Sequence, residues 1–233
     1  MKEIKGVWKF LWLDLKRSLL IFWTILFSLI MFGIIISVTV PMDGFINWNT
    51  NIPVIIYLTI IGTHLFRNSL QYGAAFGSTR RHLYIGLTTF LLMMTIFNAL
   101  VHNIFFFSVD ALTANIDTML VHSMLEYSNI EATFFLFTAA DFAVFTLFMS
   151  LSFILSIVWH QLGTIPLYIV SAGFAFLVIL PTFHPFWVEL FNWYTTATFI
   201  NLVGPLILIA VVLLLLPFPF VRRIHLFKRE KVA

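Results

Sequence analysis

Asp141 is the one acidic residue that lies deep within an apolar stretch of this sequence. An ionisable side chain in hydrocarbon is costly unless it is protonated, paired or near water, so Asp141 is a candidate functional residue. Asn98 and His102 are one helical turn apart in the preceding apolar stretch. If the two stretches are antiparallel helices, Asn98 lies at the depth of Asp141 and His102 nearer the outer membrane face. Two interpretations stay open: Asp141 makes a structural hydrogen bond between helices, or the three residues form a polar patch along a substrate path.

A second group of candidate residues lies in residues 67–82, between two apolar stretches, and begins with Arg67. Gly77 can end one helix, and Ser78 or Thr79 can cap the next. Arg80 and Arg81 would then stand at a helix N-terminus, where the helix dipole disfavours cations. Lipid phosphates or an acidic groove on a partner protein could balance them. Simple anchoring to lipid explains these charges, but it does not explain the Gly-Ser-Thr break that positions them.

The sequence lacks the common signatures of enzymes. It has no G-x-x-x-x-G-K-[ST] loop, G-x-S-x-G or H-E-x-x-H motif, and it contains no Cys. His122 and Glu126 have the i, i+4 spacing with which two side chains can share a zinc ion, but two ligands make a weak site. We therefore expect no catalytic residue, no metal site and no cofactor bound by this chain.

The elements that must position these residues are apolar helices. The chain is 61% hydrophobic and only 10% charged, with a mean hydropathy of +1.02, far from the roughly 25% charged residues of a soluble domain. We predict an all-α polytopic membrane protein, one transmembrane domain over residues 1–233. Six stretches can cross a core about 30 Å thick, and they cover about 19–40, 52–66, 83–109, 132–159, 162–180 and 200–221.

The distribution of Lys and Arg predicts the orientation of these spans. All 13 lie in residues 2–17, 67–81 or 222–231, and none lies in residues 41–51, 110–132 or 181–199. Cations near span ends stay in the cytoplasm, so we expect both termini inside a bacterial plasma membrane. Topology accounts for the positive charge, and we expect no nucleic-acid partner.

Three further segments outside the predicted spans have a distinctive composition. Residues 2–17 place lysines on one face and apolar residues on the other, which predicts an interfacial helix rather than a mere positive flank. Residues 110–131 have the composition of an ordinary acidic outer loop. Residues 182–199 are aromatic and mildly polar, which predicts a short re-entrant or interfacial segment on the outer side, before the last span.

Residues Phe76-Gly77-Ser78-Thr79-Arg80-Arg81, followed by Tyr84 and Gly86, resemble the F-G-x-[ST]-R-[RK] feature of ABC-2-type transporter permeases. The six spans, the N-terminal helix, the cytoplasmic ends and the segment before the last span also resemble that family. The resemblance implies the permease subunit of an ABC exporter, with residues 67–82 as the coupling element for a separate ATPase that binds ATP and Mg²⁺. It further implies a second copy or a homologous permease as partner.

The residues do not identify a cargo, although Phe-rich surfaces favour an amphipathic or antimicrobial peptide or a lipid-like molecule. The alternative is a non-transport immunity or sensor protein that binds a peptide at its outer segments. Six acidic residues and no Lys or Arg fall in residues 41–51, 110–132 and 181–199, and this charge would attract cationic peptides in either case.

Overall fold

The computed structural model describes residues 2–40, 46–75, 79–114, 116, 119–128, 131 and 133–218. The helices in this part of the chain are α1 (Lys2–Thr39), α2 (Asn51–Ala75), α3 (Arg80–Thr113), α4 (Phe134–Leu162), α5 (Ile165–Ile179), α6 (His184–Thr196) and α7 (Phe199–Leu215). The described part also contains two strands, β1 (Ile46–Asn49) and β2 (Met119–His122). Two 3₁₀ helices are present as well, η1 (Met124–Tyr127) and η2 (Pro181–Phe183).

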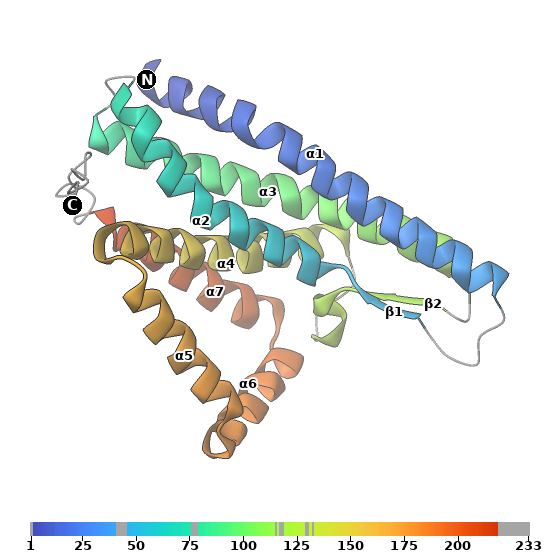
Figure 1. Cartoon of the computed structure of the whole chain (residues 1–233). Helices are drawn as coiled ribbons and strands as arrows, with labels where there is room; N and C mark the ends of the chain where they lie inside the picture. Colours follow the sequence, from blue (N-terminus) through green and yellow to red (C-terminus); the bar gives the residue numbers. More distant parts are fainter. Residues whose placement is uncertain are drawn as a thin grey trace.

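Helix α1 is continuous over 38 residues (Figure 1), so residues 2–17 do not form a separate interfacial helix. The reason is that their apolar face continues into the following stretch as one buried stripe. The stripe packs mainly on α3 and consists of Val7, Leu11, Leu19, Leu26 and Ile30. Trp8 adds hydrogen bonds from its indole Nε1 to Gly86 O at 3.1 Å and to Thr89 Oγ1 at 3.0 Å. Protein, rather than lipid, therefore covers much of this face.

Helix α4 lies at the centre of the bundle, against α2, α3 and α7 (Figure 1). Its buried face includes Phe137, Phe145 and Phe153, each with no exposed surface. Its closest approach is to α2, where a Cβ added at Gly62 would lie 2.9 Å from the carbonyl oxygen of Met149. Small residues allow apolar helices to approach this closely, which is a common mode of packing between membrane helices.

The described structure is mostly helical, as predicted, and it also contains a short parallel sheet that the sequence did not predict. Strand β1 pairs with β2, with Ile46 opposite Met119 and Asn49 opposite His122. Helix α3 extends to Thr113, and η1 follows β2, so residues 110–131 include regular structure rather than only a solvated loop. The sheet lies beside the last turns of α1 and α3 (Figure 1).

Three described helices are long and apolar enough to cross a membrane: α1, α3 and α4. A fourth crossing is possible if α5 and α6, which are bent by 73° at a short break, count as one broken span. The predicted second and sixth spans correspond to shorter apolar helices, Asn51–Leu65 and Phe199–Leu215. Most predicted stretches thus coincide with a helix, and six complete spans stay a prediction.

Helices α5 and α6 stand off from the bundle as a hairpin (Figure 1). No described side chain of α5, η2 or α6 is buried, although α5 is apolar on all sides. A helix that is hydrophobic all round requires an apolar environment. Lipid or another protein must therefore cover α5.

Candidate functional site

Asp141 of α4 is the centre of a buried polar cluster in which it accepts hydrogen bonds from two helices. Asn51 Nδ2, at the start of α2, donates to Asp141 Oδ1 at 2.7 Å. Asn103 Nδ2 of α3 donates to Asp141 Oδ2 at 2.6 Å, and His102 Nδ1 lies 2.7 Å from the same oxygen. These four side chains are at most 1% exposed. The cluster therefore joins α2, α3 and α4.

The second ring nitrogen of His102 extends the cluster to the sheet. His102 Nε2 lies 2.9 Å from Thr50 Oγ1, and the Thr50 hydroxyl donates to His122 O at 3.3 Å. Each ring nitrogen of His102 therefore lies within hydrogen-bond distance of a buried polar group, Asp141 on one side and Thr50 on the other.

The cluster also positions the segment that follows β2. The Asn51 Oδ1 atom accepts from Ser123 Oγ at 3.0 Å and from the backbone N–H of Met124 at 2.7 Å. Tyr194 of α6 in turn donates its hydroxyl proton to the Met124 carbonyl. One continuous set of hydrogen bonds thus connects α2, α3, α4, the sheet, η1 and α6.

Asn98 does not belong to this cluster, contrary to the expectation that it lies at the depth of Asp141. Its Oδ1 accepts from Trp23 Nε1 at 3.3 Å, and its Nδ2 donates to Met94 O at 2.8 Å. His102 and its neighbour Asn103 occupy the expected place, one turn further along α3. Asn98 therefore joins α3 to α1 rather than to α4.

Sequence reasoning missed four members of the cluster: Thr50, Asn51, Asn103 and Ser123. Asn103 offered a signal, since it is a polar residue inside an apolar stretch beside His102. Thr50 and Asn51 offered none, because their role depends on the pairing of β1 with β2. The Asn103 Oδ1 atom is buried and has no hydrogen-bond partner among the described residues.

The turn between α2 and α3 holds the second predicted site. Thr79 is the N-cap of α3 and its hydroxyl accepts from His82 N at 3.3 Å, as the Ser-Thr pattern predicts. Gly77 and Ser78 lie outside the described residues, as do the side chains of Arg67 and Arg80, while Arg81 is exposed.

Glu3 of α1 contacts this turn. Its Oε2 accepts from the Thr79 backbone N–H at 3.4 Å and lies 2.8 Å from His82 Nδ1. Glu3 precedes the apolar stretch that begins at Leu19. The hydrogen bond from Thr79, and to a smaller extent the contact with His82, lower the pKa of the Glu3 carboxyl group. The N-terminus of α1 is thus attached to the segment that bears the Arg pair.

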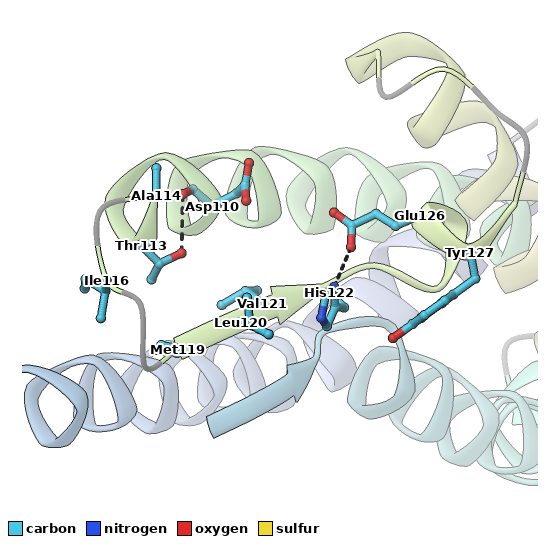
Figure 2. Close-up of a pocket in the computed structure, with 10 residues that line it drawn as sticks. All are labelled: Asp110, Thr113, Ala114, Ile116, Met119, Leu120, Val121, His122, Glu126 and Tyr127. Atoms are coloured by element: carbon cyan, nitrogen blue, oxygen red, sulfur yellow. Dashed lines mark hydrogen bonds and ion pairs between the residues drawn. The ribbon is translucent and has the colours of Figure 1, made fainter. Parts of the chain in front are cut away.

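A surface pocket of about 570 Å³ lies at the other end of α3. Figure 2 shows it between the last turns of α3, which carry Asp110, and strand β2, with Glu126 and Tyr127 of η1 at one side. Glu126 Oε2 lies 2.9 Å from His122 Nδ1 and accepts from the backbone N–H of Ser123 at 3.3 Å. His122 and Glu126 therefore contact each other, as their spacing allows.

No group of three or more His, Cys, Asp or Glu side chains in the described part of the chain is arranged to hold a metal ion. No family model, curated protein or solved structure matches this sequence or its fold. The inferences that follow are therefore based on the residues and geometry of this chain.

Proposed function

We propose that this chain is the transmembrane subunit of an ABC exporter, a permease of the ABC-2 type in the bacterial plasma membrane. One observation carries the proposal: the segment with the family resemblance closes the α2–α3 hairpin beside the start of α1 and the end of α7. Every described Lys and Arg lies in the first half of α1, the last third of α2 or the start of α3. Retention of cations in the cytoplasm supports placing this end inside, where an ATPase could reach it.

The hydrogen bonds suggest how this hairpin would transmit movement. At the cytoplasmic end, Glu3 attaches α1 to the turn between α2 and α3. At the outer end, the Asp141 cluster joins α2, α3 and α4. ATP and Mg²⁺ would act in the partner ATPase, whose closure would displace the turn. Because the helices are continuous and joined at their outer ends, they would rotate as rigid bodies about the cluster.

Such a transporter requires a second permease, either another copy of this chain or a homologue. The exposed apolar hairpin of α5 and α6 offers surface for that partner or for lipid. An amphipathic or antimicrobial peptide, or a lipid-like molecule, remains the proposed cargo, because the exposed surfaces of the helices are apolar and rich in Phe. No catalytic residue is needed in this chain, because the partner supplies ATP hydrolysis.

The second candidate function is a membrane immunity or sensor protein that binds a peptide on its outer side. The pocket between α3 and β2 favours it, because this pocket lies at the end opposite the predicted coupling segment. A sensor would not need an ATPase, so association with one separates the two functions.

The test of the exporter proposal is reversal of the Arg pair. We expect the double variant Arg80→Glu, Arg81→Glu to insert normally but to lose co-purification of the ATPase encoded beside it. Placing like charges against an acidic groove costs several kcal/mol, which is enough to prevent binding. The measurement is the ratio of ATPase to permease after affinity purification, together with the rate of ATP hydrolysis.

The matched control is Arg222→Glu, Arg223→Glu, which makes the same change of charge in the C-terminal segment. We expect this control to retain the ATPase. Equal behaviour of the two variants would show that residues 67–82 act as a membrane anchor and would remove the main support for the exporter.

A further inference from the structure

The pocket at the end of α3 combines two features that neither the coupling segment nor the Asp141 cluster uses. One wall is acidic, and the other is a strand with an edge that no other described strand pairs with. We propose that this pocket binds an extended basic peptide, whose backbone pairs with β2 and whose cationic side chain lies between Asp110 and Glu126. This inference rests on the proposed function for one point, that a natural ligand reaches the pocket from outside the cell. It does not depend on an ATPase.

The geometry of the sheet identifies the groups that remain for pairing. Thr50 N donates to His122 O at 3.1 Å, on the β1 side of the sheet. In a parallel pair of strands, the N–H and C=O of one residue point to the same side, and those of the next residue point to the other side. Because the carbonyl of His122 points to β1, the backbone groups of Leu120 and His122 pair with β1. Met119 and Val121 therefore direct their backbone groups to the opposite edge. The described sheet has only two strands, so that edge of β2 has no partner strand in it.

One backbone group at this edge is already used, since Met119 N donates to Ile116 O at 3.3 Å. Among the described residues, the backbone N–H and C=O of Val121 make no hydrogen bond at this edge. An extended peptide that adds as a third strand could use them, which is the way in which many proteins bind peptides at a sheet edge. Specificity then comes from the pockets that receive alternate side chains.

Charge complementarity favours a basic peptide. Asp110 is exposed in the pocket, and its carboxylate makes no hydrogen bond or ion pair with the described residues. Glu126 has a second carboxylate oxygen besides the one that contacts His122 and Ser123. Among the described residues no Lys or Arg lines the pocket, so a cationic group meets attraction from two carboxylates and no repulsion from a Lys or Arg.

The pocket is joined to the buried cluster. The His122 carbonyl accepts from Thr50, whose hydroxyl contacts His102, and Ser123 and Met124 bond to Asn51. A peptide bound along β2 would therefore stabilise the same segment that Asp141 helps to position. Binding outside the membrane would thus be connected with the packing of α2, α3 and α4.

The test is a binding measurement with the full chain in nanodiscs of zwitterionic lipid. The probe is a fluorescent octapeptide of alternating Lys and Thr, compared with the Gln-Thr and Glu-Thr peptides of the same length. We expect binding of the Lys-Thr peptide only, weakened by added salt because the charges are near the surface. Binding to empty nanodiscs that equals binding to the protein, or equal binding of the Gln-Thr peptide, would overturn the proposal.

Variants locate the site. We expect Asp110→Asn and Glu126→Gln each to weaken binding about threefold to fivefold, as expected for a partly exposed ion pair. Glu126→Gln keeps a side chain able to serve the capping box with Ser123. The control is Glu189→Gln, an exposed acidic residue of α6 outside the pocket, which should leave the affinity unchanged. If this control weakens binding as much as Asp110→Asn, the attraction is general and the pocket is not the site.

A second probe tests pairing with β2. An octapeptide methylated on alternate backbone nitrogens keeps its charge but cannot donate those hydrogen bonds. We expect at least about a tenfold loss of affinity for one of the two registers of methylation. Unchanged affinity in both registers would rule out strand addition.

Discussion

At the scale of residues, the cluster around Asp141 shows how a carboxyl group can be kept inside an apolar bundle. Both of its oxygens are engaged, one by Asn51 and the other by Asn103 and His102. Such a cluster is consistent with a structural role, and its buried ionisable pair is also consistent with a functional one. Neutral and apolar replacements of Asp141 distinguish the two roles.

We expect Asp141→Asn to assemble almost normally and Asp141→Leu to lose at least about 1–2 kcal/mol, the scale of polar contacts between membrane helices. In the Asn variant, the side chain keeps one carbonyl oxygen that can accept from Asn51 Nδ2 or from Asn103 Nδ2. In the Leu variant, the donors of Asn51 and Asn103 are left buried without that acceptor. Thermal unfolding in detergent measures the difference. A normally folded Asn variant without transport would show instead that the ionisable group itself is required.

At the scale of elements, close contact between α2 and α4 depends on the absence of a side chain at Gly62. An added Cβ would lie 2.0 Å from Ser152 Oγ, which could rotate, and 2.9 Å from Met149 O, which is part of the helix backbone. The adjacent hydrogen bond from Ser156 Oγ to Thr63 O, at 2.5 Å, requires the same close approach.

We expect Gly62→Ala to lower the free energy of unfolding by about 1–3 kcal/mol, because the carbonyl cannot move without separating the helices. The control is Gly173→Ala in α5, where an added Cβ meets nothing within 4 Å. That change should be neutral or slightly stabilising, since Ala restricts the unfolded chain. Thermal unfolding of both variants in detergent provides the comparison. Equal stability of the two would contradict the described contact of α2 with α4.

At the scale of the whole molecule, the two ends of the bundle differ in composition. The turn between α2 and α3 lies beside the start of α1, at the end that holds the described cations. The sheet, η1 and the acidic pocket lie at the opposite end (Figure 1). This polarity is the basis of the proposed orientation, which accessibility to a label can test directly.

We expect single Cys substitutions at positions 45, 120 and 190 to react with an impermeant thiol reagent in intact cells, and one at position 228 to react only after lysis. The native chain has no Cys, so each variant reports one site. Leu120 and Leu190 are each 42% exposed, so protein burial should not prevent their reaction. Labelling of position 228 in sealed cells would exclude six spans with both termini inside.

The sequence by itself determined the local features of this protein, because periodicity, helix capping and hydrophobic stretches depend on neighbouring residues. Thr79 caps α3, as its residue type and position predict. The tertiary structure decided which polar residues meet Asp141: His102 and Asn103 rather than Asn98. It also decided that β1 pairs with β2, which brings Thr50 and Asn51 to the cluster. These contacts join segments 38 to 90 residues apart, and the relative placement of packed helices sets them. A shift of one helical turn moves a side chain by about 5.4 Å, enough to exchange one hydrogen-bond partner for another.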